Sequence, residues 1–99
     1  MLSLDQLKTY LKIDFEDEDA DLIDILNGST ILIETATGVD SDKIKNCTNE
    51  KLKFLYIIVQ KTVCKRLYDE QSTSGSILAG RYLKLTTMYR RAVKNGEIK

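Results

Sequence analysis

The chain has 99 residues, 42% of them hydrophobic and 30% charged, which predicts one globular domain over residues 1–99 and excludes a disordered chain. Fifteen basic and fifteen acidic side chains cancel to zero net charge, and no apolar run approaches the roughly 20 residues that cross a bilayer. The first residues lack the basic and apolar segments of a signal peptide, so we expect a cytoplasmic protein.

Apolar residues recur every three or four positions, and the chain contains no proline. This pattern predicts an all-α domain of about four helices. The first helix is expected over residues 3–11, where Ser3 and Gln6 fit a capping box and Leu4, Leu7 and Leu11 form one stripe.

An acidic stretch, DFEDEDAD, follows at residues 14–21. Carboxylates in the first turn of a helix meet its unsatisfied N–H groups, so we expect this stretch to start the second helix with Asp17 or a neighbour as cap. A calcium loop is excluded, because position 6 of the loop would be Asp19 instead of Gly and position 12 would be Ile25 instead of Glu. The acidic side chains remain a candidate partner-binding face: Asp14, Glu16, Asp17, Glu18, Asp19 and Asp21.

The second helix is expected over residues 18–37, with Gly38 as its left-handed stop. Its main apolar face is predicted to hold Leu22, Ile23, Leu26, Ile33 and Ala36, with Ile25 and Leu32 partly off it. Apolar residues on two sides indicate a helix that is central or shared with a neighbouring subunit. The small pair Gly28-Ser29 in its middle is expected to let another helix approach closely, and it is a candidate subunit or portal interface.

Residues 39–49 are predicted to form a loop with one short turn, and Asn49 or Thr48 is expected to cap the third helix over residues 50–69. That helix is apolar nearly all round near its middle, so it should be the most buried helix. Residues 71–80, rich in Ser and Gly, predict a flexible loop in which the aliphatic Ile77 and Leu78 are exposed for a partner.

A fourth helix is expected over residues 81–94. Its apolar face is predicted to hold Tyr82, Leu85, Met88, Tyr89, Ala92 and Val93. Its basic face is a candidate subunit or portal interface: Arg81, Lys84, Arg90, Arg91 and Lys94.

Little in the sequence indicates catalysis. Histidine, the commonest general base, is absent, and no glycine-rich phosphate-binding loop follows a strand. Cys47 and Cys64 lie too far apart for a CxxC motif and read as two reduced thiols, with Cys64 packed in a helix. We therefore predict no enzyme activity, no metal site and no cofactor.

The charges are divided between the two halves of the chain. Residues 1–49 carry eleven acids and four bases, a net of −7, and residues 50–99 carry four acids and eleven bases, a net of +7. Two interpretations are open: the two surfaces attract within one fold, or the acidic face of one subunit meets the basic face of the next.

Four phrases, taken in order, resemble the small head–tail connector (adaptor) proteins of long-tailed bacteriophages and prophages. They are the Leu-rich LKTYLKID of residues 7–14 before an acidic run, IETATG at 33–38, LYD at 67–69, and a final Leu/Tyr-Arg segment at 85–91. The resemblance implies a structural subunit that forms a ring at the portal vertex, joins capsid to tail and extends the DNA channel. Its partners would be the portal protein, the next connector or tail-completion protein and further copies of itself, with DNA passing through unread.

The resemblance also implies a location in the virion, at the head–tail junction, after assembly in the bacterial host cytoplasm. The alternative is a small helical regulatory or nucleic-acid-binding protein of a mobile element. The basic last helix favours that alternative, while the zero net charge and the acidic first half speak against it.

Overall fold

The computed structural model describes residues 2–69 and 75–98, and for residues 75–77 it describes the backbone only. The predicted all-α class is confirmed, with no strand among these residues. Five helices follow one another: α1 (Leu4–Leu11), α2 (Asp19–Thr37), α3 (Ser41–Lys45), α4 (Glu50–Asp69) and α5 (Gly75–Lys94). The short α3 is the turn expected between the second and third predicted helices.

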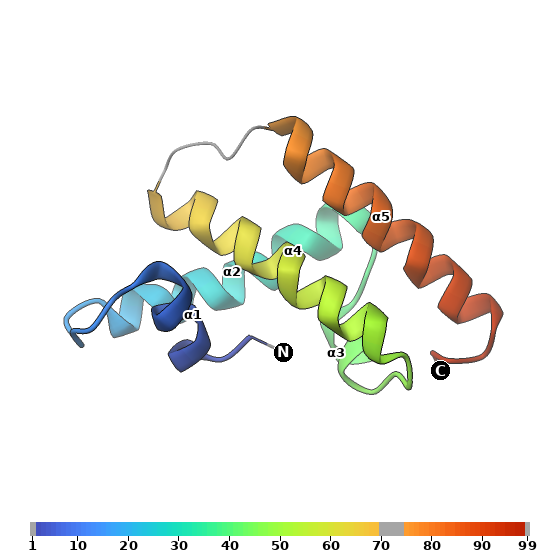
Figure 1. Cartoon of the computed structure of the whole chain (residues 1–99), viewed down its shortest axis with the longest axis horizontal. Helices are drawn as coiled ribbons and strands as arrows, with labels where there is room; N and C mark the ends of the chain where they lie inside the picture. The colour runs from blue at the N-terminus through green and yellow to red at the C-terminus, as the bar shows by residue number, and fades with distance from the viewer. Residues whose placement is uncertain (1, 70–74, 99) are drawn as a thin grey trace.

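Helix α4 lies at the centre of the fold and crosses in front of α2 (Figure 1). Helix α5 runs antiparallel beside α4 and also contacts α2, while α1 packs against both α2 and α4 (Figure 1). α4 has seven buried residues, so the prediction that it is the most buried helix is confirmed. The molecule measures 43 × 27 × 19 Å.

The helix ends follow the predicted capping chemistry in most places. Ser3 and Gln6 form the reciprocal capping box of α1. Gly38, with φ of 75°, ends α2 in the left-handed region that glycine adopts without strain. Asn49 Oδ1 accepts the backbone N–H of Leu52 at 3.0 Å and caps α4. These ends place the turns that separate the helices.

Two buried apolar clusters hold the helices together. The larger joins α4 and α5 with the C-terminal end of α2, α3 and the chain's last residues, and it includes Ile33, Tyr56, Leu85 and Ile98. The smaller joins α1 to the N-terminal part of α2 around Leu7. α2 and α4 contribute to both clusters, so the fold is one domain.

The start of the last helix differs from the prediction. Residues 75–80 continue the helix instead of forming a loop, and residues 71–74 lie outside the described residues. Leu78, expected as an exposed partner contact, is only 5% exposed and packs in the larger cluster. It lies seven residues before Leu85, two helical turns away on the same face, and this burial outweighs the low helix propensity of Ser and Gly. The side chain of Ile77 lies outside the described residues.

The faces of α2 were predicted only in part. Leu22 and Ile33 are fully buried, but Ile23 and Ala36 are exposed. Ile23 lies about 100° around the helix from Leu22, at the edge of the side that contacts α1, α4 and α5. In the same way, Val93 of α5 is exposed instead of packed in the core.

Candidate interaction surfaces

The acidic turn, residues 14–18, joins α1 to α2. The acidic stretch starts α2 as predicted, and Glu18, a neighbour of Asp17, occupies the N-cap position, although its side chain makes no capping hydrogen bond. Instead, Lys8 Nζ of α1 contacts Asp19 Oδ1 at 2.7 Å, and the Tyr68 hydroxyl of α4 donates to Glu18 Oε2 at 2.8 Å. Two of the six acidic side chains of residues 14–21, Glu18 and Asp19, therefore contact other helices of the same molecule.

The remaining acidic side chains, Asp14, Glu16, Asp17 and Asp21, are exposed. The hydrogen bond to Asp19 raises the pKa of Lys8, and the hydrogen bond to Glu18 raises the pKa of Tyr68. Among the residues that the structure describes, no group of three or more Cys, Asp or Glu is arranged to hold a metal ion. The turn and the first residues of α2 thus offer an exposed negative surface.

A buried polar contact lies where α2 crosses α4. Ser29 Oγ accepts from Gln60 Nε2 at 3.1 Å and donates to the Leu26 carbonyl at 2.7 Å. Gln60 Oε1 in turn accepts the backbone N–H of Leu2 at 3.3 Å. Ser29 is therefore an internal helix contact, although the sequence had suggested it for a subunit interface. Gln60 was missed, since a lone Gln within an apolar run gives no sequence signal for burial.

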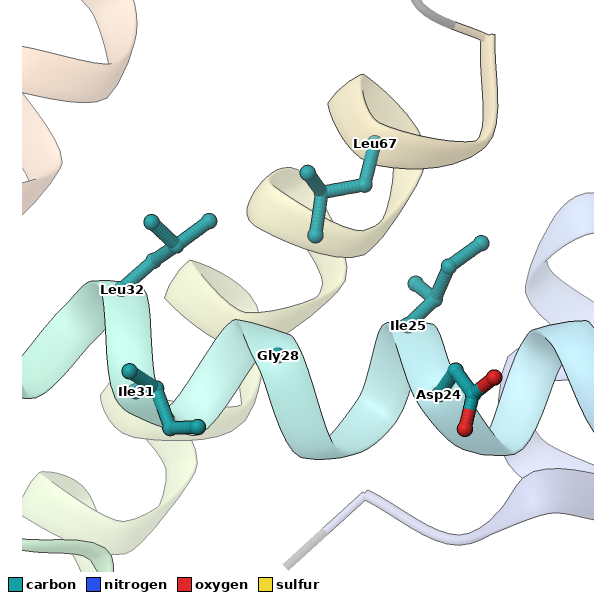
Figure 2. A pocket seen from close by; sticks show the side chains of 6 residues that line it. All are labelled: Asp24, Ile25, Gly28, Ile31, Leu32 and Leu67. Atoms are coloured by element: carbon teal, nitrogen blue, oxygen red, sulfur yellow. The ribbon is translucent and has the colours of Figure 1, made fainter.

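Gly28, beside Ser29, points in a direction about 100° away around the helix. A methyl group built on it would meet nothing within 4 Å, and the residue lines an open apolar groove of about 440 Å³ between α2 and α4. Figure 2 shows Ile25 and Leu32 on either side of Gly28, with Leu67 of α4 beyond them. The other lining residues are Asp24 and Ile31. Sequence reasoning found Gly28 but missed this groove.

The groove is bordered by large apolar side chains that the fold leaves in contact with water. Ile31 is 64% exposed, Leu32 43% and Leu67 37%. Exposed apolar side chains that cluster around a hollow mark interaction sites more often than scattered ones do. The sequence did contain a signal, because residues 25 and 32 were expected to lie partly off the main apolar face of α2.

The outer face of α5 is basic. Lys84, Arg90, Arg91 and Lys94 are exposed, as predicted for a partner-facing surface. Arg81 differs, because its Nη1 donates to Thr62 Oγ1 of α4 and the side chain is half-buried. Leu83 on the same outer face is 69% exposed, and no expectation had singled it out.

The acidic turn and the basic half of α5 are separated along the molecule. Figure 1 has the longest axis horizontal, and it places the turn between α1 and α2 at one end and the C-terminal end of α5 near the other. The structure thus does not bring the two predicted faces together within one chain. Both interpretations of the charge division stay open, because five of the bases of the second half lie on α4, which packs against α1 and α2.

The buried reactive groups are enclosed in the core. Cys47 and Cys64 are free and buried, and burial raises the pKa of the Cys64 thiol, which the Ser29 hydroxyl partly offsets. The Tyr56 hydroxyl is buried without a hydrogen-bond partner among the described residues. Burial raises its pKa to about 12, and the nearby Ser41 only partly offsets this. None of these groups faces the groove.

Within the described part of the chain, no helix is both long enough and apolar enough to cross a membrane. Comparison of the chain with known protein families, with curated proteins and with solved structures found no match.

Proposed function

We propose that this protein is a structural connector subunit of a tailed bacteriophage or prophage. Copies of it would form a ring at the portal vertex that joins the capsid to the tail and extends the DNA channel. The observation that carries the proposal is the placement of outward surfaces: an acidic end and an apolar groove on α2, and a separate basic face on α5. A subunit with two different complementary surfaces can contact one neighbour through each.

The phrases that resemble the connector family support the proposal by their positions. LKTYLKID ends α1 and enters the acidic turn, and IETATG ends α2 at the left-handed Gly38. LYD ends α4, and within it Tyr68 is bonded to Glu18. Each of these three phrases therefore marks a helix end, which is what a shared fold would require of them.

The mechanism would be geometric. Different surfaces on each subunit make a heterologous contact, and such contacts generate a ring when the rotation between neighbours closes. The portal protein would seat the ring, the next connector would dock on its far side, and DNA would pass through without sequence readout. No catalytic group is needed for this role.

Electron microscopy of the protein with its portal protein tests this function. We expect rings on the portal for the unchanged protein, and loss of rings for Arg90→Glu combined with Arg91→Glu, because both side chains are exposed and reversal removes no internal contact described in the structure. Lys51→Glu, a reversal of an exposed base on α4, is the matched control and should leave ring formation intact. Portal particles that carry no ring of the unchanged protein would contradict the proposal.

A second function is favoured by one observation, the four exposed bases of α5. A basic helix face is the electrostatic footprint of a phosphate-binding protein. Binding of duplex DNA by the isolated protein that weakens steeply with salt, together with the absence of rings, would favour a regulatory or nucleic-acid-binding protein instead.

A further inference from the structure

Two exposed helix faces of this chain match one another in shape and charge. We call the first the α2 stripe: Asp21, Asp24, Gly28, Ile31 and Leu32. All except the half-buried Gly28 are exposed, and the opposite side of the helix is turned inward, with Leu22, Ser29 and Ile33 buried. The stripe is acidic toward the N-terminal end of α2 and apolar toward its C-terminal end.

Gly28 lies at the centre of the α2 stripe and leaves a hollow there. Glycine inside a helix costs about 1 kcal/mol relative to alanine. No atom of the described structure explains that cost, because a methyl group on Gly28 would meet nothing within 4 Å. A glycine with open space above it, between Ile25 and Leu32, leaves room for a side chain from outside the monomer (Figure 2).

The second face, the α5 stripe, is Ala79, Gly80, Leu83, Thr87, Arg90 and Lys94. All six residues are exposed, while Leu78, Leu85 and Ala92 on the other side of α5 are buried. Leu83 is the one large apolar side chain of this stripe, and the residues three and four positions before it are Gly and Ala. The stripe is therefore apolar with a single protruding leucine at one end and basic at the other.

The spacing of the two stripes agrees when the helices run antiparallel. Asp24 and Asp21 lie four and seven residues before Gly28, and Thr87 and Arg90 lie four and seven residues after Leu83. With a helical rise of about 1.5 Å per residue, placing Leu83 over Gly28 brings Thr87 level with Asp24. The same register brings Arg90 level with Asp21, about 10.5 Å along the helix axis from Gly28.

The same register fits on the apolar side. Ile31 and Leu32 come three and four residues after Gly28, and Gly80 and Ala79 come three and four residues before Leu83. A methyl group built on Gly80 would also meet nothing within 4 Å. Each bulky apolar residue of one stripe thus faces a small residue of the other.

We propose that the α2 stripe of one copy binds the α5 stripe of the next copy, with Leu83 inserted over Gly28 and Arg90 paired with Asp21. The occupant is a second copy of this chain because the α5 stripe supplies the complementary charge, spacing and shape. Among the described residues, Asp21, Asp24 and Arg90 have no ion-pair partner within the chain. Both stripes face away from their own core, so the contact is between molecules.

This inference rests on the proposed function, in that it names the contact between neighbours of the proposed ring. A contact between two different stripes is heterologous. A copy that binds one neighbour through its α2 stripe can still bind a second neighbour through its α5 stripe, which a ring requires. The contact can nevertheless be measured without the portal protein, so its failure is distinguishable from failure of the connector function.

Disulfide trapping between two single-cysteine variants tests the contact and detects weak association. Asp24→Cys and Thr87→Cys, mixed and oxidised, are expected to cross-link at least about fivefold faster than Asp24→Cys with Thr9→Cys, because a specific contact raises the local concentration of the two thiols. Thr9 is exposed on α1 and lies outside both stripes. The native Cys47 and Cys64 are buried and do not compete in the folded protein.

Charge reversal within the same assay tests the register. Asp21→Arg or Arg90→Asp alone is expected to slow trapping about tenfold, and the two reversals together should restore it to within about threefold of the starting rate. Equal rates for the two mixed pairs, faster pairing of Asp24→Cys with itself, or no rescue by the double reversal would each overturn the proposal.

The remaining outcomes separate the contact from the function. Trapping with rescue in a protein that forms no ring on the portal supports the contact and contradicts the connector role. Rings on the portal that do not trap the Asp24→Cys and Thr87→Cys pair support the role and overturn the contact.

Discussion

The two sides of α2 differ in what covers them. The inner side, with Leu22, Ser29 and Ile33, is buried against α1, α4 and α5, and its polar atom is satisfied by Gln60. The outer side carries Ile31 and Leu32, equally apolar, in contact with water. Apolar residues on a helix therefore do not show by themselves which other element packs against them. The monomer explains the burial of the inner side, whereas no described residue of the monomer covers Ile31 and Leu32 on the outer side.

The largest expected effect contrasts two isoleucines of the same helix. Ile33→Ala removes a fully buried side chain from the larger cluster and should lower the free energy of unfolding by about 2–5 kcal/mol. Ile31→Ala, on the outer side, should change it by less than about 0.5 kcal/mol. Urea denaturation followed by circular dichroism measures both. Equal costs would mean that the outer side is packed within the monomer after all.

The polar contact on the inner side gives the next effect. Ser29→Ala leaves Gln60 Nε2 buried without its partner and should cost about 1–3 kcal/mol. Thr30→Ala is the matched control, because Thr30 Oγ1 donates only to the Asn27 carbonyl of its own helix. Its cost should stay below about 0.5 kcal/mol in the same urea titration. A Ser29 variant as stable as the control would show that the contact with Gln60 contributes nothing.

Alkaline pH probes the buried side chain of α4 that has no polar partner. The pKa of Tyr56 is about 12 when folded, against about 10 when unfolded, so the folded state holds the proton more tightly. The stabilisation is full below pH 10 and is lost as pH rises through 10 to 12. Between pH 9 and 11 this residue should account for a loss of about 1 kcal/mol.

Tyr56→Phe should remove that part of the loss and be neutral or slightly stabilising at pH 7, because the hydroxyl has no hydrogen-bond partner among the described residues. Urea titrations of both proteins at pH 7, 9 and 11 measure the difference. Identical losses between pH 9 and 11 would contradict this account of the buried hydroxyl.

The smallest effect on stability separates folding from assembly at one position. Gly28→Ala should stabilise the monomer by about 0.5–1 kcal/mol, since the methyl group meets nothing and alanine favours the helix. The same methyl group occupies the space proposed for Leu83 and should slow trapping of Asp24→Cys with Thr87→Cys. If the Gly28→Ala variant is more stable and the two cysteine variants cross-link as fast as before, then Gly28 is not part of the contact.

The sequence predicted the helices better than their surroundings. The range of α4, the Asn49 cap and the Gly38 stop follow from local rules, because caps and periodicity act within a few residues. The start of α5 was missed, since Ser and Gly lower helix propensity locally and the burial of Leu78 in the larger cluster is a tertiary effect.

The candidate surfaces show the same limit more sharply. Gly28 and Ser29 were predicted together as one small-residue contact, yet neighbouring positions on a helix point about 100° apart, so one faces the groove and the other α4. Leu83 was not singled out, because its exposure follows from which side of α5 packs on α4. The exposed bases of α5 needed only the charge pattern and were predicted correctly, apart from Arg81.

Electron cryomicroscopy of the protein assembled on its portal tests the central claim most directly, because it shows what covers the outer side of α2. The account predicts a ring in which α2 of each subunit runs antiparallel to α5 of the next, with Leu83 over Gly28. A ring in which Ile31 and Leu83 remain in contact with solvent would contradict it.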